Sequence, residues 1–154
     1  MPPSEEMLDR VLIVCVGNIC RSPMAEALLR ARFAARGRGN VESAGLGALV
    51  GRGADPIAVD LMKERGLDLS GHRARQLTPE ILAAADLVLV MESGHQKQIE
   101  ALAPSSRGRV HRIGKFGGFD VPDPYRQPRA AFEQALALID RGLEDFDRAF
   151  WRAS

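Results

Sequence analysis

Val11-Leu-Ile-Val-Cys15-Val-Gly-Asn-Ile-Cys20-Arg-Ser-Pro-Met-Ala-Glu26 is the stretch that decides the fold. Residues 11–14 are β-branched or aliphatic, which is typical of a strand buried on both faces. Ser22-Pro23 is a helix-start signal, because serine can cap a helix and proline suits its first position. The stretch therefore predicts a strand, a turn over residues 15–22 and then a helix.

The turn has the composition of an anion-binding loop. A helix start after a strand and a tight turn gathers backbone N–H groups and positive potential around an anion. Gly17 and Asn18 tolerate the backbone conformations that such a turn needs, and Arg21 offers a planar fork that matches two phosphate oxygens. Cys15 is expected to ionise readily beside these groups, and a thiolate is a nucleophile. We therefore predict a phosphatase that works through a covalent cysteine, rather than a structural cysteine with a surface arginine.

The composition fits one domain over residues 1–154. The chain is 45% hydrophobic, and its net charge of +1 gives no case for binding nucleic acid. No segment has the apolar length of a membrane span, and the start is polar and acidic, unlike a signal peptide. We expect a cytoplasmic protein with a loose arm over residues 1–9. The two cysteines, five positions apart on one turn, do not indicate a disulfide framework or a zinc site.

Strand patterns alternate with helix patterns along the whole chain. The predicted strands cover about 10–15, 41–45, 86–91 and 109–113. The predicted helices cover about 23–36, 56–65, 79–84, 93–102, where Ser93 is expected to cap, and 128–150. This order predicts an α/β fold, a three-layer αβα domain with a four-stranded parallel sheet. Ligands in such folds bind at the carboxyl ends of strands, which is where Cys15 lies.

A phosphate ester also needs an acid that protonates its leaving group, and the turn supplies none. Asp120 and Asp123 lie in the glycine- and proline-rich loop after the fourth strand, which starts from the same edge of the sheet. We predict Asp123 as the general acid, because Pro124 stiffens the loop and Tyr125 can form a wall of the pocket. Asp120 is the alternative.

Cys15-Val-Gly-Asn-Ile-Cys-Arg-Ser-Pro23 together with Asp123-Pro-Tyr125 resembles the low-molecular-weight protein tyrosine phosphatase family. The resemblance covers about residues 10–150. The runs 47–51, 71–73 and 90–92 resemble the bacterial branch, some of whose members dephosphorylate tyrosine kinases that control capsule and exopolysaccharide export. Eukaryotic members usually have two adjacent tyrosines after the acid, whereas Arg126 follows Tyr125 here.

The resemblance implies a role for each matching residue. Cys15 would form a phosphocysteine, Asp123 would protonate the leaving tyrosine oxygen and then activate water, and Ser22 would donate to the sulfur. Arg21 and the N–H groups of residues 16–21 would hold the phosphoryl oxygens, while Ser43 and His72 would hold Asn18 in shape. The residues expected to form or support the loop are Val16, Gly17, Asn18, Ile19, Cys20, Ser22, Ser43 and His72.

The remaining expectations concern the pocket and its partners. Leu46, Leu49 and Tyr125 are apolar enough to enclose a phenyl ring, although Leu46 and Leu49 are equally expected to anchor the loop. The implied partner is a phosphotyrosine protein, a tyrosine autokinase in the bacterial branch. We expect a monomer that needs no metal or cofactor, and that neither inserts into membranes nor binds nucleic acid.

Three other functions are less well supported. Arginine phosphatases of the same fold carry threonine where this chain has Ile19. Arsenate reductases share the loop but need further cysteines to carry a disulfide away. A phosphate-binding module without activity would not need Cys15, Arg21 and Asp123 together.

Cys20 has two interpretations that the sequence leaves open. It is close enough in the turn to trap an oxidised Cys15 as a disulfide, which would protect the nucleophile from irreversible oxidation. It is equally expected to be a small buried hydrophobic side chain under the loop.

Overall fold

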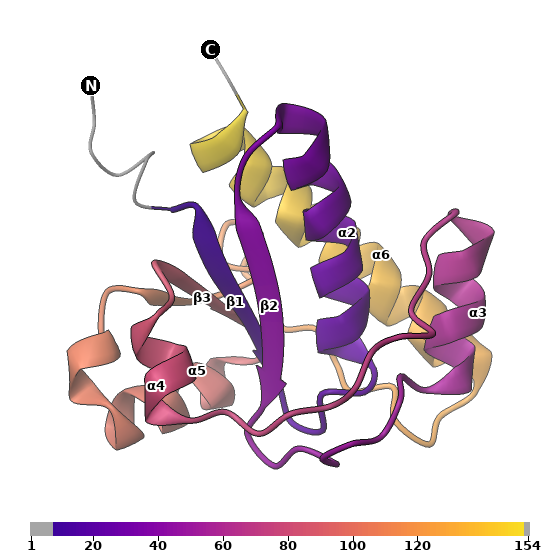
Figure 1. The fold of residues 1–154 in the computed structure, drawn as a ribbon, viewed down its shortest axis with the longest axis horizontal. Coiled ribbons are helices and arrows are strands. Elements are labelled where there is room, and N and C mark those ends of the chain that lie inside the picture. The colour runs from indigo at the N-terminus through magenta and orange to yellow at the C-terminus, as the bar shows by residue number, and fades with distance from the viewer. Residues whose placement is uncertain (1–7, 153–154) are drawn as a thin grey trace.

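The computed structural model describes residues 8–152, which form a parallel sheet between two layers of helices (Figure 1). The strand order is β2-β1-β3-β4, and all three pairings are parallel. The strands are β1 (Arg10–Cys15), β2 (Asn40–Gly45), β3 (Leu87–Val90) and β4 (Val110–Arg112). The predicted α/β fold with four parallel strands is thus confirmed.

Within residues 8–152, five α-helices cover the sheet. They are α2 (Arg21–Arg36), α3 (Pro56–Glu64), α4 (Pro79–Ala83), α5 (Ser93–Leu102) and α6 (Arg129–Phe146). A short 3₁₀ turn, η1 (Pro104–Ser106), precedes β4, and α6 continues into a wider turn, η2 (Asp147–Trp151). Helices α2, α3 and α6 lie on one face of the sheet, and α4 and α5 lie on the other (Figure 1).

The alternation of β1 side chains divides the core between the two faces, because successive strand residues point in opposite directions. Val11 and Ile13 belong to the larger cluster, which includes the buried stripe of α6. Leu12 and Val14 belong to the smaller cluster with residues of α4 and α5. β1 is therefore buried on both faces, as predicted, and holds the loop that follows it in a fixed place.

Two predicted helix caps are wrong. α2 begins at Arg21, with Cys20 as its N-cap and no side chain capping it, so Ser22 lies inside the helix. α5 begins at Ser93 itself, with Glu92 as an N-cap that makes no capping bond. By contrast, Asp55 accepts a hydrogen bond from Ile57 N at the start of α3. The Ser22 hydroxyl is instead committed to the candidate active site.

The predicted N-terminal arm is only partly within the described region. Residues 1–7 lie outside the described residues. Leu8 and Asp9, which were expected to belong to the arm, are anchored: Trp151 Nε1 donates to Leu8 O over 3.0 Å, and Asp9 pairs with Arg36 and Arg38. Among the described residues, no helix is both long and apolar enough to cross a membrane.

Candidate active site

The loop after β1 is hydrogen-bonded to the segment after β2. Leu46 N donates to Cys15 O (2.9 Å), Gly47 N to Val16 O (2.9 Å) and Leu49 N to Gly17 O (3.1 Å). This close approach requires glycine at position 45, where a Cβ atom would lie 2.4 Å from Val16 O. The pairing of β1 with β2 thus continues into the loop of residues 15–22, here called the phosphate loop, and fixes its first three residues.

The Cys15 sulfur lies at the base of this loop and is buried. Its Sγ atom is 2.9 Å from Ser22 Oγ and accepts a hydrogen bond from Asn18 N over 3.3 Å. Asn18 has a φ of 59°, a left-handed conformation that asparagine adopts more readily than most residues. That turn of the backbone directs an N–H group at the sulfur.

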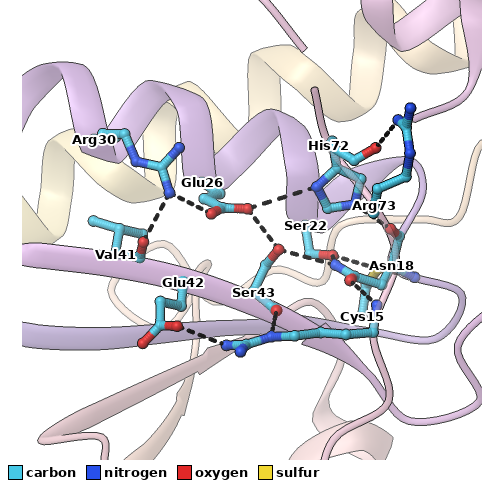
Figure 2. Close-up of polar contacts among 11 residues, drawn as sticks. Cys15, Asn18, Ser22, Glu26, Arg30, Val41, Glu42, Ser43, His72 and Arg73 are labelled. Atoms are coloured by element: carbon cyan, nitrogen blue, oxygen red, sulfur yellow. Dashed lines mark hydrogen bonds and ion pairs between the residues drawn. The ribbon is translucent and has the colours of Figure 1, made fainter. Parts of the chain in front are cut away.

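A buried polar network behind the loop fixes the direction of these bonds (Figure 2). Arg75 N donates to Asn18 Oδ1 over 2.9 Å. This bond identifies the oxygen of the Asn18 amide, so the opposite atom, Nδ2, is the donor. Asn18 Nδ2 donates to Ser22 Oγ (2.7 Å) and to Ser43 Oγ (3.0 Å). Because Ser22 accepts there, its own hydrogen is available for Cys15 Sγ, as is needed to stabilise a thiolate.

The network continues into α2 through Glu26. Ser43 Oγ donates to Glu26 Oε1 over 2.6 Å, and Arg30 pairs with Glu26 Oε2 at 2.5 Å. His72 Nε2 lies 2.7 Å from Asn18 O and must donate, because a carbonyl only accepts; its Nδ1 lies 3.9 Å from Glu26 Oε1. Ser43 and His72 therefore make the contacts with Asn18 that the family resemblance implies (Figure 2).

The front of the loop presents free donors. Within residues 8–152, the backbone N–H groups of Gly17, Ile19 and Cys20 donate to no protein acceptor, and all three residues line a cavity. The first N–H groups of α2 add to them, since a helix start leaves its donors unpaired. This combination favours an anion with several oxygens.

Arg21 brings a buried guanidinium to the same cavity, with only 2% of its side chain exposed. One terminal nitrogen binds Glu92 Oε2 (2.5 Å) and Val121 O (2.8 Å). The other lies 3.7 Å from Asp123 Oδ2. Glu92 thus holds the charge through one nitrogen, and the second nitrogen lies toward Asp123, which lines the same cavity as Cys15.

His95 lies behind Glu92 and is the least satisfied group in this region. It is buried, its Nε2 is 3.7 Å from Glu92 Oε2, and its Nδ1 has no partner among the described residues. Burial, followed by the charge of Arg21, lowers the pKa of His95 below its usual range. The folded state therefore favours the neutral imidazole over the charged one.

The two candidate acids have different surroundings. Asp123 lines the cavity, and its Oδ1 accepts from Tyr125 N over 3.1 Å, which leaves Oδ2 directed toward Arg21. Asp120 accepts from Ser93 N (3.1 Å) and pairs with Arg112 (2.9 Å), so it connects α5 to β4. The geometry therefore favours Asp123.

The cavity has a volume of about 140 Å³ and is lined mainly by predicted residues. They are Cys15, Val16, Gly17, Ile19, Cys20, Arg21, Gly47, Leu49, Asp123 and Tyr125. Leu46 does not line this cavity: its side chain packs against the smaller core cluster on the α4 and α5 face, which fits the alternative of a loop anchor. Leu49 and Tyr125 form the apolar walls, and Gly47, which was not predicted, completes the mouth.

Cys20 lies under the cavity with 4% of its surface exposed. Burial and the nearby carboxylate of Asp55 raise the pKa of its thiol. These surroundings fit the expected small buried side chain, and a protective disulfide with Cys15 stays a prediction.

Besides Gly47, the sequence reasoning missed several polar residues around the loop, which are Glu26, Arg75, Glu92 and His95. Among them, Glu92 alone lies in a run that resembles the bacterial branch, Val90-Met-Glu92, and that run carried no assigned role. Within residues 8–152, no group of three or more histidine, cysteine, aspartate or glutamate side chains could hold a metal ion.

Comparisons with known proteins agree with this geometry. The family model for low molecular weight phosphotyrosine protein phosphatases matches residues 10–152. A probable low molecular weight protein-tyrosine-phosphatase, EpsP of Ralstonia solanacearum, is 50% identical over 138 residues, which is 90% of this chain and 93% of the relative.

Solved structures have the same fold. Wzb of Vibrio vulnificus, in complex with benzylphosphonate, gives a TM-score of 0.87 at 38% identity and covers 93% of this chain and 99% of its own. A YwlE mutant from Bacillus subtilis and the YwlE arginine phosphatase each give a TM-score of 0.84 at 31% identity and cover 91% of this chain, with 97% and 94% of their own chains covered. The fold alone therefore does not distinguish phosphotyrosine from phosphoarginine.

Proposed function

Because the chain belongs to the low molecular weight phosphotyrosine protein phosphatase family, we propose that it hydrolyses phosphotyrosine in proteins through a phosphocysteine at Cys15. One observation carries the proposal: a single cavity is lined by a cysteine, an arginine and a carboxylate, Cys15, Arg21 and Asp123. A nucleophile, a phosphate-binding cation and a proton donor thus meet around one small space.

In the first step, the Cys15 thiolate attacks phosphorus, and the bond from phosphorus to the tyrosine oxygen breaks. Asp123, entering the step protonated, gives its proton to the leaving phenolate. Arg21 and the free N–H groups of the loop stabilise the charge on the three equatorial oxygens. The products of this step are a protein tyrosine, phosphocysteine and the Asp123 carboxylate.

In the second step, the Asp123 carboxylate takes a proton from water while the water oxygen attacks phosphorus. The phosphorus–sulfur bond breaks, and inorganic phosphate leaves. The Ser22 hydroxyl, 2.9 Å from Sγ, donates to the departing thiolate and lowers the cost of its release. The enzyme then returns to its starting protonation state.

The walls of the cavity support an aromatic ester. Leu49 and Tyr125 lie on its sides, and Ile19 adds an aliphatic side chain at the loop. A flat phenyl ring between apolar walls removes apolar surface from water, whereas a guanidinium there would lose hydration. Ile19 is also the position where the arginine phosphatases that this chain resembles carry threonine.

A bacterial tyrosine kinase linked to exopolysaccharide production is the proposed physiological substrate. The resemblance to the bacterial branch and the 50% identity to EpsP support this choice. We propose a monomer that acts in the cytoplasm, where the catalytic domain of such a kinase would be accessible. Dephosphorylation of that kinase by the purified protein, compared with an unrelated phosphotyrosine protein, measures the preference.

The enzymatic proposal is tested with matched peptides that carry either phosphotyrosine or phosphoarginine. We expect turnover of the phosphotyrosine peptide, and loss of essentially all of it in Cys15→Ser, since the hydroxyl is a far weaker nucleophile at neutral pH. Rapid quenching of the parent protein with labelled substrate should trap one phosphoryl group on Cys15. Faster turnover of phosphoarginine would contradict the substrate assignment.

A further inference from the structure

Most arginines in the described region are already paired. Salt bridges join twelve of the 18 arginines to carboxylates, from Arg10 with Asp86 to Arg152 with Glu144. Arg73 and Arg109 donate to backbone carbonyls, and Arg141 lies over the ring of Phe119. The arginines without a protein acceptor are therefore the exception.

The exposed arginines whose side chains meet no acceptor within residues 8–152 are Arg52, Arg107, Arg126 and Arg141. Arg52 follows Leu49 on one loop that borders the candidate active site, and its backbone N–H binds Leu49 O at 3.0 Å. Arg126 follows Tyr125 on the second loop that borders this site. Arg107 precedes β4 and so lies at the opposite edge of the sheet.

The backbone of Arg126 is in an unusual conformation. Its φ is 64°, in a turn where Gln127 N donates to Pro124 O over 2.8 Å. A turn with positive φ at its third residue normally has glycine or asparagine there, because a longer side chain is sterically unfavourable. Strain of this kind accumulates at functional sites, where the side chain is needed.

The side chain of Arg126 remains close to the pocket. Its guanidinium carbon lies 5.2 Å from the centre of the Tyr125 ring, and that ring is a wall of the cavity. Contact with the aromatic face holds the cation near the mouth without neutralising it. The nearest acidic side chain on this loop, Asp123, is directed instead toward Arg21.

We infer that Arg126, assisted by Arg52, is a specificity-determining residue that binds a negatively charged group next to the phosphotyrosine of the substrate protein. The inference rests on the proposed phosphatase activity and adds a substrate preference to it. Carboxylates and a second phosphate share the chemistry that a guanidinium recognises. Substrates with acidic or multiply phosphorylated tyrosine segments are therefore preferred over neutral ones.

Three phosphotyrosine peptides test the inference. They have the same length and differ only in the residues beside the phosphotyrosine, which are aspartate, asparagine or a second phosphotyrosine. The readout is the ratio of kcat/KM for each charged peptide to that for the asparagine peptide. Because exposed charge pairs are weak, we expect a parent ratio of about 3 to 10, which falls as salt is raised. A preference for only one charged peptide identifies whether carboxylate or phosphate is bound.

Substitutions locate the effect. Arg126→Gln should lower the ratio about two- to fivefold. Arg126→Lys keeps the positive charge and should retain most of the ratio. The double variant Arg126→Gln/Arg52→Gln should have a ratio close to about 1. Arg107→Gln is the matched control, with the same change of charge at the far edge of the sheet, and should leave the ratio unaltered. Circular dichroism and melting temperature show that each variant is folded.

Two outcomes overturn the inference: a parent ratio of one, or an equal fall of the ratio in the Arg107 and Arg126 variants. Either result can occur while the asparagine peptide is still hydrolysed, so the proposed activity would stand. Failure of the parent protein on all three peptides would instead contradict the proposed activity.

Discussion

The two sides of the phosphate loop are built differently. Behind the loop, Asn18 directs its amide to Ser22 and Ser43, and Glu26 and His72 complete a network in which most polar atoms have partners. In front of it, Asp123 and Arg126 are exposed, and the walls are single side chains on loops. The comparison teaches that stabilising a phosphoryl charge needs fixed donors, whereas admitting a protein substrate needs a surface that is still free to bind.

The largest expected effect is a loss of kcat on substitution of Asp123, which lies on the exposed side of the phosphate loop. Asp123→Asn should lower kcat for a phosphotyrosine peptide about 10²- to 10⁴-fold, the usual range for a general acid. The loss should be smaller for p-nitrophenyl phosphate, whose leaving group needs less protonation. Steady-state kinetics on both substrates measures the difference.

Asp120→Asn is the matched control for that experiment. Asp120 connects Ser93 N to Arg112 and does not line the cavity, so its replacement should change kcat only a few-fold. If Asp120→Asn rather than Asp123→Asn shows the large loss, the acid is misassigned.

A smaller effect, on stability, is expected behind the loop. Asn18→Ala removes two hydrogen bonds that the amide donates and one that it accepts. It also places alanine at a φ of 59°, a left-handed conformation that alanine adopts less readily than asparagine. We expect the free energy of unfolding to fall by about 2–4 kcal/mol, from buried polar groups that lose a partner and from backbone strain. Urea denaturation measures it.

Asn18→Gly separates the two causes. Glycine accepts the positive φ but lacks the amide, so this variant should be destabilised by about 1 kcal/mol less than the alanine variant. A glycine variant as stable as the parent protein would mean that the polar network adds nothing to stability.

The smallest effect concerns pH and the group behind Arg21. The folded-state pKa of His95 is lowered, so the native state favours the neutral imidazole. Its contribution to stability is therefore complete above the unfolded pKa near 6.5 and is lost as pH falls below it. Between pH 7.5 and 5.5, the parent protein should lose more free energy of unfolding than His95→Gln does, by about 1 kcal/mol at most.

His111 provides the comparison for this measurement. Burial, followed by the charge of Lys115, also lowers its pKa, but it lies on β4 and makes no contact with Arg21. Loss of kcat at low pH should be altered by His95→Gln and not by His111→Gln, because only His95 faces the Arg21–Glu92 pair. Identical pH profiles of kcat for the two variants would mean that His95 does not influence the active site.

Sequence reasoning reached the parts of the site that are local or that match a known motif. Residues 11–26 predicted the strand, the loop and the helix, because the hydrophobic pattern and the glycine and proline positions determine the backbone conformation within a few residues. Asp123 was predicted from its place in a loop at the carboxyl edge of a parallel sheet, and its side chain lines the cavity. The roles of Ser43 and His72 came from family resemblance, since their partner Asn18 is distant in the chain.

What sequence reasoning missed depends on long-range packing or on side-chain direction. Glu92 lies 71 positions from Arg21, and nothing near either residue marks the pair. Leu46 was expected either in the pocket or as a loop anchor, and only the structure decides between them: its side chain packs against the smaller core cluster on the other face of the sheet. Ser22 has the composition of a cap, yet its hydroxyl is used by the cysteine that precedes it by seven positions.

The distance in sequence between Arg21 and its acceptors has a consequence for protein synthesis. Arg21 donates to Val121 O, which is 100 positions later in the chain. At roughly 5–20 residues per second, the ribosome adds Val121 about 5–20 s after Arg21. The nascent chain therefore carries Cys15, the candidate nucleophile, for several seconds before it carries Val121, so the arrangement of Arg21 described above cannot form until Val121 has been added.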